Sequence, residues 1–367
     1  MTRLLFVLGW LVVGGEETEV RHLANHLDRS RYRLEVVACQ RREGMSDLTH
    51  RELERLGVAV DRRPYRLSFE ETVEYLAGRF RDVDVVVACQ AVPDVVPALE
   101  LLERPPPLIE HGGLVAEATS GPKHLTARYV GVCRSIRDAA ASVMPGREQC
   151  ALEIPSMVDL REFSPSHRAP ARSALGLADG VAAIGWVGRL DRKKRVEDFL
   201  AAASIVRRSR PEARFLVIGG ADAFMPDYER ELRALAADSG LDGSVDFLGD
   251  RADVPQILSA LDVFVWLSRA EGMPHVIGEA GAARLPVVAT RDNGSEQQLE
   301  DGVSGLHVPH EDPPATATAI ERLLADDALR RRLGTALRRT VERLYSVDVV
   351  VPQWERLFAD VLAEAGR

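Results

Sequence analysis

Residues Glu271-Gly272-Met273-Pro274-His275-Val276-Ile277-Gly278-Glu279 lie between two apolar runs of strand length, 261–268 and 285–290. Four small residues, 280–283, and Arg284 precede the second run. This order predicts a strand, a loop, a helix and a second strand, which together form one unit of a parallel sheet. Glu271 then follows the carboxyl end of a strand, where open α/β sheets bind ligands. Glu279 is expected about two turns into the helix.

The two glutamates have two interpretations. Carboxylates at this spacing occur often by chance, and spacing alone favours a solvated helix position over a ligand contact. The setting favours a ligand, because the loop contains Gly272 and Pro274 and follows a buried strand. A helix that begins at such a loop offers free amides and the positive end of its dipole, which suit a phosphate group.

The length and composition bound the architecture. A chain of 367 residues exceeds a typical single domain, so two domains are expected. Its formal net charge of -9 argues against nucleic acid as the main partner. The apolar run 4–13 lacks the cleavage site of a signal peptide and is better explained as a first buried strand. No run reaches about 18 apolar residues, the length of a membrane span. We therefore expect a cytoplasmic protein without a transmembrane segment, and peripheral attachment to the inner membrane stays open.

Neither cysteines nor histidines are spaced as metal ligands. The four cysteines are widely separated and form no CxxC pair, which is typical of free thiols in a reducing compartment. The nine histidines show no HExxH spacing. The sequence therefore predicts no metal site and no bound cofactor.

Strand-like and helix-like stretches alternate along the chain, which predicts doubly wound parallel sheets. The pattern fails between 155 and 170, where proline and polar residues gather, so we place a linker there. The predicted organisation is an N-terminal Rossmann-like domain over 1–160, a C-terminal Rossmann-like domain over 161–345 and a final amphipathic helix over 346–367. The expected strands are 4–13, 34–39, 58–60, 83–89, 108–113, 129–133, 182–187, 213–219, 245–248, 261–268, 285–290 and 305–308.

Two loops have residues suited to phosphate. Gly14 and Gly15 open the first helix and permit close backbone approach to a ligand, although the loop is not a GxGxxG fingerprint. Arg189, Lys193 and Lys194 follow the strand 182–187. An arginine fork with a lysine point charge can clamp a diphosphate. A simple strand end in the first loop and a solvated basic loop in the second are the alternatives.

Taken together, these motifs resemble the retaining glycosyltransferases of family 4, which have the GT-B fold. The resemblance rests on Gly188-Arg189-Leu190 with Lys194, on Glu271 to Glu279, on 302–309 and on Gly14-Gly15-Glu16. It covers nearly the whole chain in the expected order. The implied fold is α/β, with two Rossmann-like doubly wound domains facing across a cleft.

The resemblance assigns catalytic roles to four residues. It implies that Arg189 and Lys194 bind the donor diphosphate and stabilise the departing nucleoside diphosphate, as a metal does in other folds. Glu271 would hydrogen-bond hydroxyls of the transferred sugar. His111, at a strand end in the N-terminal domain, would contact that sugar near the reacting carbon. Without the resemblance, a structural loop role would suit His111 better.

The remaining implied contacts hold the donor. Glu279 would bind the ribose hydroxyls. Amides near the helix start would face the phosphate or the sugar, and the first glycine loop would lie against the phosphates. The residues concerned are Met273, His275, Val276, Gly14 and Gly15.

The chain departs from the family pattern at three places. Arg195 stands where the family has a glycine after its lysine, which leaves Lys193 and Lys194 as alternatives, with the spacing from Arg189 favouring Lys194. Leu267 replaces the proline before Ser268, and 292–294 replaces a double glycine.

The implied activity is transfer of a hexose or N-acetylhexosamine from a nucleotide-diphosphate sugar to an acceptor hydroxyl, with a UDP-sugar preferred over GDP-mannose. The sequence offers no carboxylate for a covalent intermediate of the kind that retaining hydrolases form. The resemblance implies metal-independent front-face substitution instead. The acceptor is a small molecule, a saccharide or a lipid. A nucleotide-sugar epimerase of similar fold and a sugar-binding protein without catalysis are the alternative functions.

Overall fold

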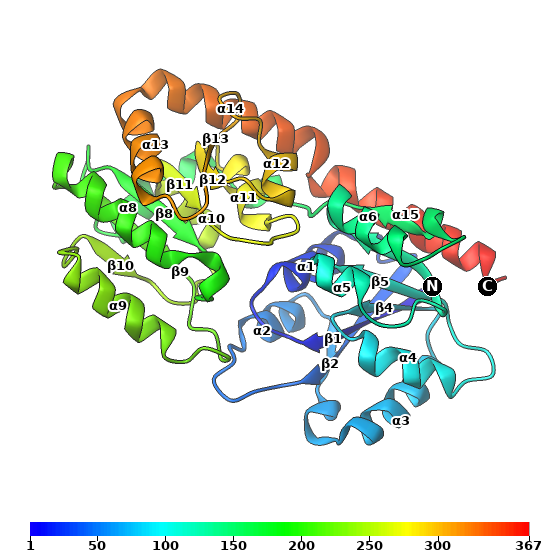
Figure 1. Cartoon of the computed structure of the whole chain (residues 1–367). Coiled ribbons are helices and arrows are strands. Elements are labelled where there is room, and N and C mark those ends of the chain that lie inside the picture. The colour runs from blue at the N-terminus through cyan, green and yellow to red at the C-terminus, as the bar shows by residue number, and fades with distance from the viewer. Residues whose placement is uncertain (367) are drawn as a thin grey trace. The chain divides into compact units, whose positions relative to one another are not determined.

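The computed structural model describes residues 1–366, without the side chains of residues 165 and 293. The chain forms two compact units (Figure 1). Unit 1 comprises Met1–Met157 and Val347–Arg367, and unit 2 comprises Val158–Ser346. The units therefore change at 157/158 and 346/347, compared with the boundaries at 160 and 345 expected from the sequence.

Unit 1 is built on a seven-stranded parallel sheet of order β3-β2-β1-β4-β5-β6-β7. Every strand pairing in this sheet is parallel, as the alternation of strands and helices predicts. The strands are β1 (Thr2–Trp10), β2 (Tyr32–Gln40), β3 (Ala59–Asp61), β4 (Val85–Cys89), β5 (Leu108–Gly112), β6 (Thr126–Gly131) and β7 (Ala151–Glu153). The α-helices are α1 (Gly15–His26), α2 (Leu48–Arg55), α3 (Phe69–Phe80), α4 (Val92–Glu100), α5 (Val115–Thr119), α6 (Arg134–Ser142) and α15 (Val347–Glu364).

Helices cover both faces of this sheet. Leu4, Phe6 and Leu8 of β1 point into one core, which they share with α1 and with the final helix α15. Leu5 and Val7 point into the opposite core, formed with α3 and α4. Alternate residues of a strand face opposite sides of the sheet, so a strand buried on both faces is a continuous apolar run.

Unit 2 is built on a six-stranded parallel sheet of order β10-β9-β8-β11-β12-β13. The strands are β8 (Ala183–Val187), β9 (Arg214–Ile218), β10 (Val245–Phe247), β11 (Val263–Trp266), β12 (Val287–Thr290) and β13 (Leu306–Val308). The α-helices are α7 (Arg168–Ala174), α8 (Val196–Ser209), α9 (Tyr228–Asp238), α10 (Val254–Ala260), α11 (His275–Ala282), α12 (Asn293–Gln298), α13 (Pro313–Ala325) and α14 (Asp327–Leu344).

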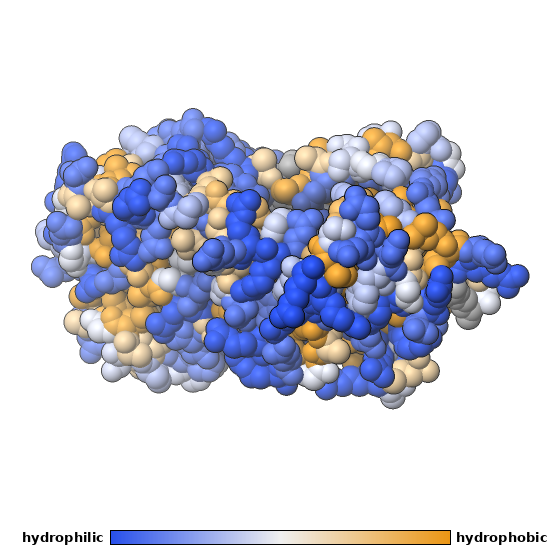
Figure 2. All heavy atoms as spheres, turned by 90° about the horizontal axis from the view of Figure 1, so that it is seen from below, coloured by the Kyte–Doolittle hydropathy of each residue, from blue (hydrophilic) through white to orange (hydrophobic). Residues whose placement is uncertain are grey.

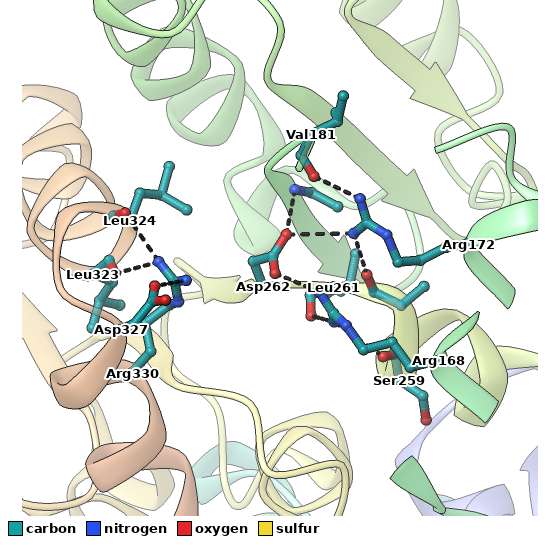
Figure 3. Close-up of polar contacts among 12 residues, drawn as sticks. Arg168, Arg172, Val181, Ser259, Leu261, Asp262, Leu323, Leu324, Asp327 and Arg330 are labelled. Carbon is teal, nitrogen blue, oxygen red and sulfur yellow. Dashed lines mark hydrogen bonds and ion pairs between the residues drawn. The ribbon is translucent and has the colours of Figure 1, made fainter. Parts of the chain in front are cut away.

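Two arginines of α7 anchor the first helix of unit 2 to the sheet. The guanidinium group of Arg168 donates to Asp262 Oδ1 at 2.6 Å and to the carbonyl of Leu261 at 2.5 Å. Arg172, which is buried, lies 3.5 Å from Asp262 Oδ2 and donates to the carbonyl of Val181 at 2.7 Å (Figure 3). Residues 168–170, which the sequence placed in the linker, therefore belong to a packed helix.

Two further expectations differ from the structure. The first strand ends at Trp10 instead of at residue 13, because the Val12 N–H donates to Glu17 Oε1 at 3.2 Å instead of to a neighbouring strand. Val13 is exposed. Helix α4 was not among the predicted elements, and it contains two prolines. Pro93 lies at the first turn, where it is tolerated, and Pro97 lies inside the helix.

The surface carries no extended hydrophobic region on the face drawn in Figure 2, where hydrophobic residues form separate patches among hydrophilic ones. Among the residues that the structure describes, every helix is too short or too polar to span a bilayer.

Candidate functional site

The candidate site of unit 2 lies at the switch point of its sheet. Strands β8, β9 and β10 succeed one another to one side, and β11, β12 and β13 succeed one another to the other side. Strands β8 and β11 are adjacent, and the chain continues from β8 to one side of the sheet and from β11 to the other side. Ligands of open α/β sheets bind at this point, outside the carboxyl ends of the strands.

A lysine–glutamate pair joins these two loops. Lys194, from the loop after β8, donates to Glu271 Oε1 from the loop after β11 at 2.7 Å. Both side chains are 13% exposed, so the pair is largely removed from water. Lys193 Nζ is 3.8 Å from the same oxygen and is more exposed. The structure therefore places Lys194 in the closer contact with Glu271.

Hydrogen bonds fix the orientation of the Glu271 carboxylate. The Ser268 hydroxyl donates to Oε1 at 2.8 Å, and the Glu271 N–H donates to Asp292 Oδ2 at 2.9 Å. The two loops are also joined through their backbones, because the Arg269 N–H donates to the Lys193 carbonyl at 2.9 Å. The pair is thus held by several independent contacts.

The electrostatics of the pair are reciprocal. Burial by itself raises the pKa of Glu271, but the ammonium groups of Lys194 and Lys193 and the hydrogen bonds from Lys194 and Ser268 outweigh it and lower that pKa. Burial lowers the pKa of Lys194, and the neighbouring carboxylate opposes this effect. Glu271 is therefore an anion at neutral pH and keeps a cation close to the switch point.

Lys194 also lies above an aromatic platform. Its Nζ is 4.8 Å from the centroid of the Trp266 ring, and Trp266 stacks on Trp186 with ring centroids 6.2 Å apart. A cation over the face of an indole ring gains electrostatic attraction. Trp266 belongs to β11 and Trp186 to β8, so side chains of the two central strands support the Lys194 ammonium group.

The backbone is strained on both sides of the pair. Arg195 directly follows Lys194 with φ of 56°, and Ala270 directly precedes Glu271 with φ of 53°. Side chains other than glycine adopt this left-handed region at a cost of about 1–2 kcal/mol. Arg195 is held there by ion pairs with Asp198 at 2.8 Å and with Glu197 at 3.0 Å. Such strain persists where the surrounding structure over-determines it, often at ligand sites.

Arg189 follows β8 in the same loop. Its Nε is 3.0 Å from Asp222 Oδ2, and Asp222 is itself buried. No contact of the described residues engages the two terminal nitrogens of Arg189. The guanidinium group is therefore anchored through one nitrogen and retains donors suited to a bidentate anion.

The remaining predicted donor contacts of unit 2 lie at the start of α11. Pro274 caps this helix, so the amides of His275 and Val276 are at its first turn and Met273 precedes it. Glu279 is the fifth residue of α11, only a little over one turn from its start, in contrast to the two turns expected. It is partly exposed.

The predicted residues of unit 1 lie at the carboxyl ends of its strands. Gly14 is the N-cap of α1 and Gly15 is its first residue. A Cβ on Gly14 would lie 2.6 Å from Glu17 Oε2, so a larger residue there would displace the Glu17 carboxylate. His111 is buried near the end of β5, with its Nδ1 3.9 Å from Cys89 Sγ and its ring 5.4 Å from Trp354.

Sequence reasoning missed several residues that position the site. The Asp222 partner of Arg189 and the aromatic platform of Trp186 and Trp266 come from different strands, and no local spacing connects them to the motifs. A glycine requirement was also missed. A Cβ on Gly294 in α12 would lie 1.6 Å from the Gly272 carbonyl oxygen, so α12 packs directly on the Glu271 loop.

No group of three or more His, Cys, Asp or Glu side chains is placed to hold a metal ion within the described part of the chain. The free cysteines are Cys39, Cys89, Cys133 and Cys150.

Comparison with known proteins places this geometry in a family. Residues 182–326 match the family described as glycosyl transferases group 1. The D-inositol 3-phosphate glycosyltransferase of Corynebacterium urealyticum is 37% identical over 179 residues, which cover 47% of this chain and 42% of the relative. The match thus spans less than half the length of that relative.

Solved structures are similar over nearly the whole chain. The Anabaena protein HepE in complex with UDP and glucose has a TM-score of 0.85 at 22% identity and covers 98% of this chain and 100% of that one. Sucrose-phosphate synthase from Thermosynechococcus elongatus has a TM-score of 0.78 at 20% identity, with 99% and 100% covered. The resemblance inferred from the motifs is confirmed to this extent: residues 182–326 of unit 2 match the glycosyl transferases group 1 family, and the chain has the GT-B fold.

Proposed function

We propose that this chain is a retaining glycosyltransferase that moves a hexose or N-acetylhexosamine from a nucleotide-diphosphate sugar, preferably a UDP-sugar, to an acceptor hydroxyl. The observation that carries the proposal is the Lys194–Glu271 contact at the switch point of unit 2, with Arg189 in the same loop. Cationic groups beside a carboxylate suit a diphosphate linked to a polyhydroxylated sugar, because the cations bind the diphosphate and the carboxylate accepts hydrogen bonds from the sugar hydroxyls.

In this proposal the cations act on the leaving group. Arg189 and Lys194 bind the diphosphate and stabilise the charge that develops on it as the bond to the sugar breaks. Glu271 accepts hydrogen bonds from hydroxyls of the transferred sugar, and Glu279 accepts them from the ribose. The amides of Met273, His275 and Val276 lie near the start of α11, where a helix dipole favours an anion.

The proposed chemistry needs neither a covalent enzyme intermediate nor a metal. The bond between the anomeric carbon and the phosphate oxygen breaks, and the acceptor oxygen bonds to that carbon on the same face. The acceptor proton passes to the departing phosphate oxygen. Catalysis then rests on positioning and on charge stabilisation by the fixed side chains.

The preference for UDP is supported by a structural relative. HepE of Anabaena has been crystallised with UDP and with UDP-glucose, and it covers this chain almost completely. A thermal-shift panel of UDP, GDP and ADP with their sugars tests the donor, because a ligand that binds only the folded protein raises its unfolding temperature. We expect UDP compounds to give the largest shift.

Variants connect the shift to the site. Lys194→Met should abolish most of the nucleotide-dependent shift, whereas Arg208→Met, at an exposed position on α8, should leave it unchanged. Equal shifts in the wild type and in Lys194→Met would place the nucleotide elsewhere and refute the proposal.

Measurement of nucleoside diphosphate release separates the alternatives. A transferase releases the diphosphate faster when acceptor is added. An epimerase of similar fold interconverts the sugar without acceptor-dependent release, and a sugar-binding protein releases none.

A further inference from the structure

Three carboxyl groups of unit 1 gather at the switch point of its sheet. Glu16 and Glu17 lie in the first turn of α1, after β1, and Glu117 lies in α5, after β5. We call these three residues the acidic cluster. Strand β1 is adjacent to β4, and the chain order reverses between them, so the cluster lies where an open parallel sheet binds ligands.

Two of the three carboxyl groups, those of Glu117 and Glu16, lie at one backbone amide. The Gly113 N–H donates to Glu117 Oε2 at 3.1 Å, and the same amide lies close enough to Glu16 to act on its pKa. Burial raises the pKa of Glu16 well above its usual value, and the charges of Glu117 and Glu17 raise it further. Like charges held together in this way are costly unless a cation joins them.

Two buried polar atoms at the cluster have no hydrogen-bond partner among the residues that the structure describes. Glu16 is only 9% exposed, and its Oε1 accepts no hydrogen bond. Tyr129 of β6 is 1% exposed, and its hydroxyl also has no partner. A Cβ on Gly112 would lie 2.0 Å from the Tyr129 hydroxyl and 3.6 Å from Glu117 Oε2, so these two groups face the same space. Buried polar groups without partners are uncommon and are often completed by a ligand.

The surroundings of the cluster reach solvent and include apolar surface. Gly15 is exposed, Glu117 is partly exposed, and the side chains of Val13 and Val115 are exposed although they are apolar. Gln90, which follows β4, adopts a left-handed φ of 55° and lies close enough to hydrogen-bond Glu16. Carboxylates next to small apolar patches suit a ring that carries a charged group and has a hydrocarbon face.

We infer that the acidic cluster binds the acceptor through a protonated amine, so that the acceptor is an amino sugar or an amino cyclitol. An ammonium group donates three hydrogen bonds, which carboxylate and hydroxyl oxygens can accept. A phosphorylated polyol would be repelled by the same carboxylates. This chain would thus differ from its relative named D-inositol 3-phosphate glycosyltransferase. The inference rests on the proposed function, because it names the acceptor of that reaction.

Isothermal titration calorimetry with matched probes tests the inference directly. The first pair is 2-deoxystreptamine with myo-inositol, the second is D-glucosamine with D-glucose, and D-myo-inositol 3-phosphate and Mg²⁺ are titrated separately. We expect the amine of at least one pair to bind ten times more tightly than its neutral partner. Glu16→Gln should remove this preference. Glu74→Gln, at an exposed site on α3, should retain it.

Tyr129→Phe provides a variant in which misfolding is not a concern, because it removes only a hydroxyl without a partner. We expect its unfolding temperature to match that of the wild type and its affinity for the amine to fall at least threefold. Unchanged affinity in both Glu16→Gln and Tyr129→Phe overturns the inference. Equal or tighter binding of the neutral or phosphorylated probes does so too, as does binding of Mg²⁺ in place of the amine.

The calorimetry is performed without nucleotide, so it is independent of the donor site. Amine binding without any nucleotide-dependent thermal shift would refute the proposed function and leave the amine site standing. A nucleotide-dependent shift together with transfer to neutral acceptors alone would support the proposed function and refute the amine site.

Discussion

Removing either partner of the Lys194–Glu271 pair should destabilise unit 2, and removing both should restore part of the loss. The charges are 2.7 Å apart, which corresponds to about 6 kcal/mol of attraction at an effective dielectric constant of about 20. Desolvation of the two groups offsets most of this attraction. We therefore expect Lys194→Met and Glu271→Gln each to cost about 2–3 kcal/mol, because each leaves one largely buried charge without its partner.

The double variant should cost about 2 kcal/mol, well below the sum of the single variants, which gives a coupling energy of about 3 kcal/mol. Urea unfolding followed by tryptophan fluorescence is a suitable assay, because Trp186 and Trp266 lie beside Lys194. The control is the exposed pair Arg233–Glu229 on α9, where the same substitutions should give a coupling below about 0.5 kcal/mol. Additive costs at Lys194 and Glu271 would refute the reasoning.

Five further changes have expected outcomes. Burial raises the pKa of Glu19 from 4.5 to about 8, so between these pH values the folded chain binds more protons than the unfolded chain, and its stability falls as the pH rises. Glu19→Gln should reduce this fall by about 1 kcal/mol per pH unit, measured as the free energy of unfolding between pH 5 and 8. Gly294→Ala should lower the unfolding temperature by about 5 °C, because its Cβ would overlap a carbonyl oxygen, whereas Gly78→Ala meets no atom within 4 Å and should not lower it. Arg189→Ala should mainly reduce turnover, and Glu279→Ala should mainly weaken nucleotide binding; steady-state kinetics with varied donor separates the two. Activity should survive EDTA, and restoration of a chelated enzyme by Mg²⁺ would contradict the metal-independent chemistry.

The alternation of apolar strands and amphipathic helices was enough to predict both sheets. Helix α3 (Phe69–Phe80) starts at a signal that is readable in the sequence, because Ser68 and Glu71 form a capping box directly before its apolar period. Helix α4 lacks such a signal: it contains two prolines, which usually end helices, and the tertiary packing that buries Val95 and Val96 is not visible in local sequence.

The site was only partly predictable for a similar reason. Lys194 and Glu271 were singled out because each follows an apolar strand, and the parallel topology brings those strands together. The sequence could not predict that Lys194 would be held by the Trp266 ring or that Asp222 would anchor Arg189. These contacts depend on side chains of three different strand ends, and only the completed sheet sets their distances.

The two units place opposite charges at equivalent positions of the same architecture. At the switch point of unit 2, three cationic side chains outnumber the two carboxylates with which they pair: Arg189 contacts Asp222, and Lys193 and Lys194 contact Glu271. At the switch point of unit 1, Glu16 has two carboxylates as its strongest charged neighbours. Since both sheets share the doubly wound topology, the side chains in the loops decide which ligand each sheet would attract, which we propose is an anion in unit 2 and a cation in unit 1. The net charge of -9 conceals this division, because it sums two local fields that act on different parts of the proposed reaction. Left-handed residues next to both sites, Ala270 in unit 2 and Gln90 in unit 1, are consistent with loops shaped for ligands.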